Sequence, residues 1–252
     1  MNYLLSRMVG GAYVIAVEDT YTWDVPSYTN VYVLQRNGQT ILIDAGLKQY
    51  QPAILAALGE IGVTPAQVTH ILLTHGHHDH VEGAACFGQA QKFVHTADLP
   101  FLSAPLAAQF TAYTPVADGF RFTAAGLHDF EISFVNTHSP GSVAIYDHIT
   151  KALFVGDFFC YFGEALPAGE LVTDSDYIRR GSCQYVAAQA AAGGTEFASF
   201  ITGLGRLRAY QPDFFCTGHG VVLRDDIQDF INQMWLSGTQ TGRDKKMKWE
   251  EF

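Results

Sequence analysis

Short runs of β-branched and aromatic residues, separated by polar turns, open the chain and predict strands. The pair Asn37-Gly38 lies between two of these runs. Asn-Gly at such a place is a strong signal for a β-hairpin, because both residues adopt positive φ at little cost. Residues 18–27 break the alternation and contain Pro26, so we expect a loop there. The three strands predicted by this pattern cover residues 12–17, 31–34 and 40–43.

Apolar residues at helical spacing predict a helix that begins at Pro52 and ends before Gly62. Proline is favoured in the first turn of a helix and glycine just beyond its last turn. Ile54, Leu55 and Leu58 would share one face of this helix. Further helices are predicted at about 174–191, 195–209 and 225–237, and further strands at 71–73, 91–95, 130–137, 143–147, 152–156 and 213–217.

Predicted strands and helices interleave from one end of the chain to the other, which is typical of an α/β fold. We find no shift in composition and no linker rich in Pro or Ser that would divide the chain. The sequence therefore predicts one domain over residues 1–252.

Composition restricts the class of partner. The chain has 252 residues, of which 48% are hydrophobic, enough for a full core. It carries 15 Lys and Arg against 25 Asp and Glu, a net charge of −10, which argues against nucleic acid as the main partner. No apolar run is long enough to span a membrane, and no secretory signal is visible, so we expect a cytoplasmic protein. The four cysteines are widely spaced, as expected for reduced thiols rather than a disulfide framework or a zinc knuckle.

Four histidines stand within residues 75–80, where the chain reads His-Gly-His-His-Asp-His. Imidazole nitrogens and carboxylate oxygens are the ligands that Zn²⁺ and similar divalent metals take. His75 and His77 can point to one side at the end of the predicted strand 71–73. Asp79 and His80 follow in the turn, which can aim them at a second point. One loop could therefore serve two metals.

Further candidate ligands follow other predicted strands. His138, Asp157 and His219 each stand where a strand stops and a loop begins. Functional side chains gather at such positions in open α/β sheets. Each of them alone is a weak signal, because His or Asp after a strand is more often a cap or turn residue. Their joint order along the chain is a strong one.

Taken together, these residues resemble the ligand set of the metallo-β-lactamase superfamily. The turn Asp44-Ala45-Gly46 is similar to the family's first motif, and residues 29–32 (Thr-Asn-Val-Tyr) resemble its opening strand. The resemblance extends from about residue 12 to 225 and implies an αββα four-layer sandwich of two mixed sheets flanked by helices. It also implies a division of ligands: His75, His77 and His138 on one metal, Asp79, His80 and His219 on the other, Asp157 between them, and Asp44 orienting a ligand histidine.

The resemblance implies a metal-dependent hydrolase that uses a metal-bridging hydroxide on a small ester, lactone or thioester. Asp79 is the expected catalytic residue and would steady the leaving group. Zinc is the expected metal, and Fe, Mn, Co or Ni would fit the same ligands. A phosphodiesterase, a non-catalytic metal-binding protein and a redox di-iron protein stay open as alternatives. His77 argues against the last of these, because the oxygen-reducing members carry a carboxylate at that position.

The long segment between Asp157 and His219 is the expected source of specificity. We expect a helical insertion at about 160–200 that covers the metals as a lid or wall. Its Tyr161 and Tyr177 are candidate pocket residues, and Tyr21 and Trp23 of the early loop could close the other side. The expected partner is a small-molecule substrate, and the oligomeric state cannot be read from the sequence.

Overall fold

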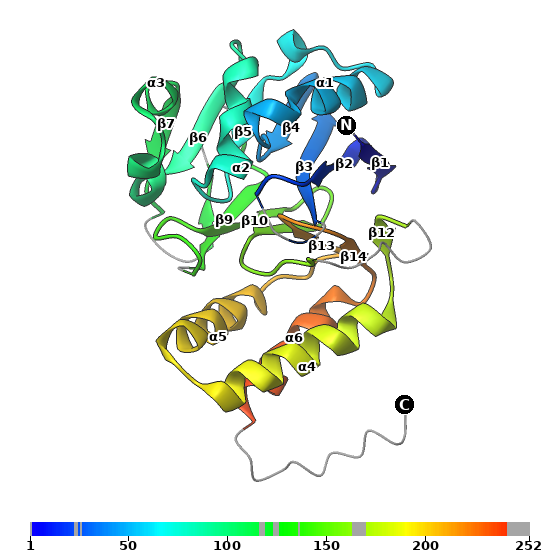
Figure 1. Ribbon diagram of the computed structural model, residues 1–252, viewed down its shortest axis with the longest axis vertical. Coiled ribbons are helices and arrows are strands. Elements are labelled where there is room, and N and C mark those ends of the chain that lie inside the picture. The colour runs from blue at the N-terminus through cyan, green and yellow to red at the C-terminus, as the bar shows by residue number, and fades with distance from the viewer. Residues whose placement is uncertain are drawn as a thin grey trace.

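Two β-sheets form the centre of the molecule (Figure 1). The computed structural model describes residues 2–22, 25, 27–115, 119–122, 126–135, 137–162 and 170–240. Within this part of the chain each sheet has seven strands.

The first sheet is antiparallel over its first four strands and parallel over the rest, in the order β1 to β7. The predicted hairpin at Asn37-Gly38 joins β3 to β4, and both turn residues have positive φ. The strands are β1 Tyr3–Arg7, β2 Ala12–Asp19, β3 Ser27–Arg36, β4 Gln39–Ile43, β5 His70–Leu72, β6 Gln91–His95 and β7 Phe110–Tyr113.

The second sheet is also mixed and has the order β12-β14-β13-β11-β10-β9-β8. Strands β9, β11 and β13 run in the same direction, because β10 is antiparallel to both β9 and β11, and β13 is parallel to β11. Their carboxyl ends therefore meet at one edge. The strands are β8 Phe120–Arg121, β9 Phe130–Phe134, β10 Val143–Asp147, β11 Ala152–Gly156, β12 Val172–Thr173, β13 Phe214–Thr217 and β14 Val222–Arg224.

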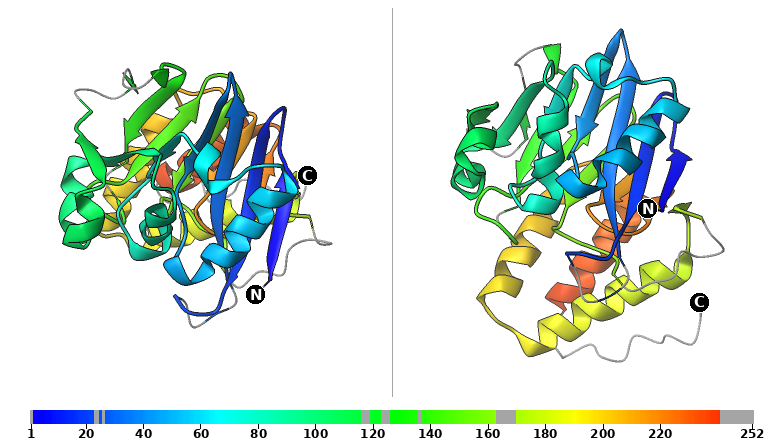
Figure 2. Two further views of the ribbon diagram at one scale, coloured as in Figure 1. Left: turned by 90° about the horizontal axis from the view of Figure 1, so that it is seen from above. Right: turned by 45° about the horizontal axis from the view of Figure 1, so that its top comes forward.

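Helices cover the outer face of each sheet, as the two views of Figure 2 show. Helices α1, α2 and α3 lie on the first sheet, and α4, α5 and α6 lie on the second (Figure 1). The predicted four-layer αββα sandwich of two mixed sheets is thus confirmed. The helices are α1 Gln51–Glu60, α2 His78–Val81, α3 Ala104–Ala107, α4 Asp176–Ala192, α5 Thr195–Leu207 and α6 Ile227–Thr239.

Three apolar layers hold the four structural layers together. Alternate residues of β2 point to opposite faces, so Ile15 packs under α1 while Val14 packs between the sheets. The middle layer joins side chains from both sheets, including Tyr32 and Phe154, whose ring centroids are 5.0 Å apart. The third layer lies between the second sheet and α4–α6.

Several short strands have no counterpart in the sequence prediction: β1, β7, β8, β12 and β14. The predicted strand 130–137 ends earlier, at Phe134, and the predicted strand 71–73 begins and ends one residue earlier. Across the described residues, no helix combines the length and the apolar character needed to cross a membrane.

Candidate metal centre

Strand ends place the predicted ligands at one edge of the sandwich. His75 and His77 follow β5 in a loop, and the chain then enters the short helix α2 with Asp79 and His80. The others follow strands of the second sheet whose carboxyl ends meet at that edge: His138 after β9, Asp157 after β11 and His219 after β13.

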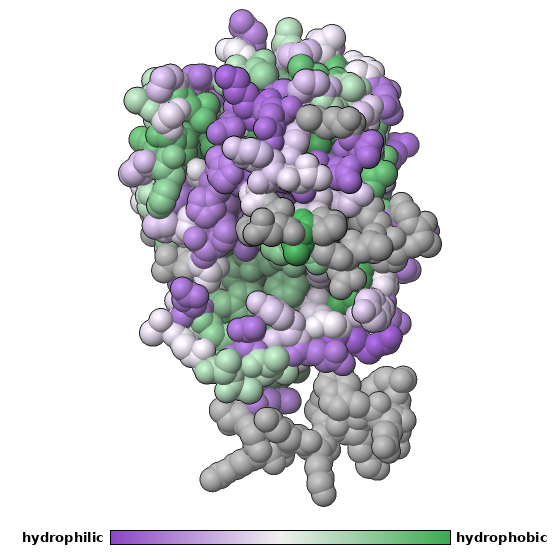
Figure 3. Space-filling model, viewed as in Figure 1, coloured by the Kyte–Doolittle hydropathy of each residue, from purple (hydrophilic) through white to green (hydrophobic). Residues whose placement is uncertain are grey.

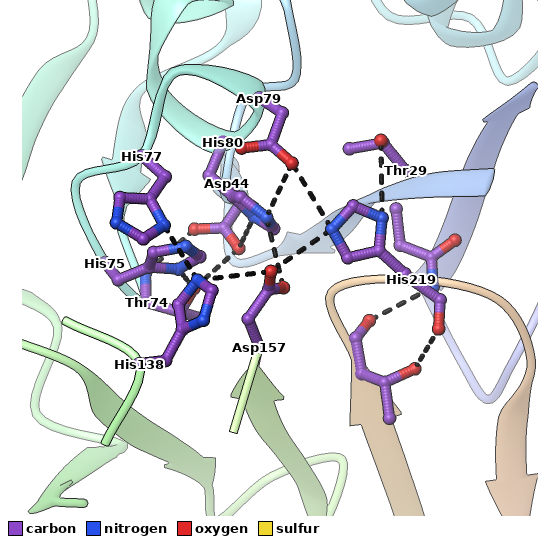
Figure 4. Close-up of polar contacts among 12 residues, drawn as sticks. Thr29, Asp44, Thr74, His75, His77, Asp79, His80, His138, Asp157 and His219 are labelled. Carbon is purple, nitrogen blue, oxygen red and sulfur yellow. Dashed lines mark hydrogen bonds and ion pairs between the residues drawn. The ribbon is translucent and has the colours of Figure 1, made fainter. Parts of the chain in front are cut away.

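The structure brings all seven predicted ligands together in two neighbouring groups (Figure 4). Within each group, one donor atom per residue lies within 4.8 Å of the others, close enough to hold one metal ion. The first group is His75, His77 and His138, and the second is Asp79, His80, Asp157 and His219.

Asp157 lies between the two groups. Its Oδ2 is 3.4 Å from His138 Nε2 in the first group and 3.3 Å from His219 Nε2 in the second. Its Oδ1 is 3.2 Å from His80 Nε2. A single carboxylate thus reaches both sets of donors, which is the arrangement expected of a bridging ligand.

Neighbouring oxygens set the orientation of three histidine rings. Thr74 donates its hydroxyl proton to Asp44 at 2.8 Å, so its oxygen accepts from His75 Nδ1 at 3.1 Å. His80 Nδ1 donates to Asp44 Oδ2 at 2.9 Å, which is the contact predicted for Asp44. Each of these rings therefore directs Nε2 into the cluster.

The same arrangement recurs at His219. Thr29 donates to Asp19 Oδ2 at 2.8 Å, and Thr29 Oγ1 lies 3.5 Å from His219 Nδ1. The remaining Nε2 of His219 faces Asp79 and Asp157 (Figure 4).

These residues fit divalent metals. His75 Nε2 is buried and makes no hydrogen bond within the described part of the chain. A buried polar atom without a partner costs roughly 1–3 kcal/mol, so the site favours something that accepts its lone pair. A set of imidazole and carboxylate donors matches Zn²⁺, Fe, Mn, Co or Ni.

Burial favours the neutral form of two imidazoles in the first group, and the group is open to solvent on one side. Burial lowers the pKa of His75, and the nearby His80 lowers it further. Burial also lowers the pKa of His138, whose side chain keeps 27% of its surface exposed. Each of these two rings is therefore neutral near pH 7 and keeps one nitrogen lone pair for a metal, and the exposed side gives access for a small molecule.

In the second group, interactions between opposite charges together shift the pKa values more strongly than burial, which acts in the other direction. Asp157, Asp79 and Asp44 raise the pKa of His80, and Asp157 and Asp79 raise that of His219 to about 9. In return, His80 and His219 lower the pKa of Asp79 and of Asp157. Both carboxylates stay ionised at neutral pH.

A comparison of the sequence with models of known protein families shows which family the chain belongs to. The sequence model of the metallo-β-lactamase superfamily matches residues 24–219, which is most of the chain. The chain belongs to the metallo-β-lactamase superfamily.

Two relatives in this superfamily match about half of the chain. A β-lactamase-like protein 2 homolog of Drosophila melanogaster is 31% identical over 149 residues, and a hydroxyacylglutathione hydrolase of Erwinia tasmaniensis is 31% identical over 142 residues. The matches cover 54% and 56% of this chain, and 48% of each relative. The chain thus aligns with about half the length of these relatives.

Solved structures share the fold. A mutant of the flavo di-iron protein of Thermotoga maritima superposes with a TM-score of 0.74 at 20% identity, covering 93% of this chain and 61% of that one. At 20% sequence identity, this similarity shows that the two proteins share a fold, and it does not show that they catalyse the same reaction.

Sequence reasoning missed a buried carboxylate that joins two ligand loops. Asp98 accepts hydrogen bonds from Gly76 N at 2.8 Å, from Gly141 N at 2.7 Å and from the Ser139 hydroxyl at 2.6 Å. One loop carries His75 and the other carries His138. A Cβ at Gly141 would lie 2.6 Å from Asp98 Cγ, so glycine is needed for this approach.

The predicted pocket residues divide into two sets. Tyr161 and Tyr177 line a cavity that also includes His138 and Asp157. Tyr21 is exposed at the turn after β2 and is not among the described residues that line this cavity. Trp23 lies outside the described residues. Burial of its thiol and the nearby Asp157 carboxylate raise the pKa of Cys160.

Proposed function

We propose that this protein is a dinuclear metal-dependent hydrolase of a small-molecule ester, lactone or thioester. The observation that supports it most directly is the position of Asp157, within 3.4 Å of ring nitrogens in both donor groups. Histidines 75, 77 and 138 would hold one ion, and Asp79, His80 and His219 the other. Two such ions, when bound, polarise a substrate oxygen and make water a nucleophile at neutral pH.

Asp79 is the proposed catalytic residue. It is ionised at neutral pH, and its Oδ2 is 3.3 Å from His219 Nε2. We propose that this oxygen accepts a proton from the attacking water and returns it to the leaving oxygen or sulfur.

Zinc is the proposed metal, because all four donors proposed for each ion, with Asp157 shared between the two, are imidazoles or carboxylates of the kind zinc takes. Iron stays the main alternative, since several solved structures with this fold are named as di-iron proteins. His77 favours the hydrolase over a redox protein, because the oxygen-reducing members of the superfamily carry a carboxylate at that position.

Two adjacent histidines provide a matched test. His77 lies in the first donor group, whereas His78 is exposed to solvent. We expect His77→Ala to remove most metal-dependent turnover, and His78→Ala to leave it within about twofold of the wild type, as is usual for a surface substitution.

The assay is a panel of lactones, glutathione and CoA thioesters, a β-lactam and a phosphodiester, run on metal-replete protein with Asp157→Asn beside it. The proposal would be supported if the wild type turns over an ester, lactone or thioester and the Asp157→Asn variant does not. Turnover of the phosphodiester alone would replace it with a phosphodiesterase. Visible absorbance with two bound irons, oxygen consumption and no hydrolysis would replace it with a redox protein.

A further inference from the structure

A large groove leaves the candidate metal centre and runs along two helices. It has a volume of about 1160 Å³, begins at His138 and Asp157, and continues beside α4 and α5. In the space-filling view, the surface above these helices is hollowed and hydrophobic (Figure 3). Pockets for small ligands usually measure about 300–1,000 Å³, so this groove has room for more than the reacting group of a small ester.

Packed aromatic rings form the floor of the groove. Phe158 stacks on Phe200 with ring centroids 4.8 Å apart, and Phe159 packs edge-on against Tyr185 at 6.1 Å. Phe158 and Phe159 follow Asp157 directly and are largely buried. The floor is therefore apolar and continuous with the proposed reaction site.

Large apolar side chains around the opening remain in water. Tyr177 is 68% exposed and Tyr185 57% exposed, both on α4 at the groove. On the other side of the cluster, Phe101 is 53% exposed, and its ring lies 6.1 Å from that of His77. Grouped exposed apolar surface of this kind marks a ligand or interaction site more often than isolated surface residues do.

The charges in the groove do not favour a polyanion. Apart from Asp157 at the metal centre, the charged residues among its described lining are Arg180 and Glu196, which have opposite signs. A phosphate-rich group would need several cations. An uncharged apolar chain fits this wall better.

We propose that the groove binds the extended apolar acyl chain of an ester or thioester, with its carbonyl at His138 and Asp157. This inference rests on the proposed hydrolase and narrows its substrate class. Each methylene that enters the groove would add binding in both the ground and transition states, and so raise kcat/KM.

A chain-length series tests the proposal in the metal-replete protein. We expect kcat/KM for p-nitrophenyl esters to rise from acetate to decanoate by about fourfold for each methylene that is fully buried, before it levels off. A flat series with metal-dependent turnover would overturn the groove proposal and leave the hydrolase intact.

Two glycines provide a filling variant and its control. A Cβ at Gly181 on α4 meets nothing within 4 Å, and Gly181 lines the groove. A Cβ at Gly59 on α1 is equally free, but Gly59 lies on the opposite layer of the sandwich. Leucine at either helical position is locally favourable.

We expect Gly181→Leu to lower kcat/KM for the decanoate ester by about tenfold or more, the equivalent of about two methylenes displaced from the groove. The acetate ester should keep its rate, and Gly59→Leu should change neither. An equal loss on both esters in Gly181→Leu would overturn the proposal.

A binding measurement separates the groove from the chemistry. Titration calorimetry with decanoate and with acetate reports the contribution of the chain without turnover. The wild type could bind decanoate more tightly than acetate, with Gly181→Leu abolishing the difference, and yet hydrolyse no ester. That result would support the groove proposal and overturn the hydrolase proposal. Equal affinity for the two acids would overturn the groove.

Discussion

At the scale of single residues, the centre depends on oxygens that do not belong to the donor groups. Asp44 and Thr74 orient His80 and His75, and Thr29 stands behind His219. These contacts hold each ring with Nε2 turned inward, which fixes both tautomer and angle. The donor set is therefore organised before any ligand binds.

Asp98 tests how much this support matters. We expect Asp98→Asn to weaken metal binding by about 10–100-fold, as loss of an outer hydrogen-bond partner typically does, because the amide cannot accept at both oxygens. Competition with a chelator measures the affinity. Asp213→Asn is the control, since Asp213 is exposed on the surface. Equal affinities for the two variants would contradict a positioning role for Asp98.

Asp19 provides a prediction about pH. Burial opposes ionisation, but hydrogen bonds from Thr22, Tyr21 and Thr29 lower its pKa below the ordinary value of 3.8. A group whose pKa is lower in the folded than in the unfolded state stabilises the fold at pH values above its unfolded-state pKa. This stabilisation is lost as the pH falls through the folded-state pKa. We expect Asp19→Asn to reduce the free energy of unfolding by about 1.5–3 kcal/mol at pH 7.

The difference between wild type and Asp19→Asn should shrink on acidification below about pH 4, because only the wild type then loses a charged acceptor. Urea unfolding at several pH values measures it. Asp174→Asn, at an exposed position, is the control. A difference that stays constant down to pH 2 would show that the carboxylate charge does not contribute.

At the scale of elements, the ends of strands decide where the chemistry lies. The loop after β13 must pass close to Asp157 and His80, and Gly218 makes this possible, because a Cβ there would overlap Asp157 Oδ1 and lie 2.8 Å from His80 Cε1. The backbone N–H of Asn30 in β3 donates a hydrogen bond of 2.8 Å to the Gly218 carbonyl, which connects this loop to the first sheet.

We therefore expect Gly218→Ala to displace Asp157 and to empty the second donor group first. Metal content by mass spectrometry should fall from two ions per chain toward one, with about 1–3 kcal/mol lost from stability through overpacking. Gly59→Ala, in open space on α1, should change neither. Full metal content in Gly218→Ala would contradict this account of the loop.

At the scale of the whole molecule, the apolar layer between the sheets holds the two halves of the centre in register. Asp79 and His80 come from the first sheet's side, while Asp157 and His219 come from the second. Phe154 of β11 is fully buried in this layer, three residues before Asp157.

Phe154→Ala should therefore affect stability and metal binding together. We expect a loss of about 3–5 kcal/mol in the free energy of unfolding, as for other buried aromatic truncations. Urea unfolding measures it, and metal affinity should fall as the sheets repack. Tyr185→Ala, at an exposed position, should leave stability within about 0.5 kcal/mol. A stable Phe154→Ala variant would show that the sheets are held together elsewhere.

The sequence by itself determined the α/β order of most elements and the seven candidate ligands, and the four layers followed from its resemblance to the metallo-β-lactamase superfamily. Runs of β-branched and aromatic residues predict β2, β3 and β4, Asn37-Gly38 predicts the hairpin, and residues 75–80 carry a dense run of metal-binding side chains. Such signals are local, so they can be read along the chain. Strands as short as β8 and β12, of two residues each, carry too little pattern to be predicted.

Only the tertiary structure decided which groups meet. Asp98 looks like any polar residue after a strand, and its partners Gly76 and Gly141 are 22 and 43 residues away. The place of Asp157 between two donor groups and the apolar groove beside α4 depend in the same way on the order of strands and the packing of layers. Contacts between distant segments arise from the whole core, and no short stretch of sequence contains them.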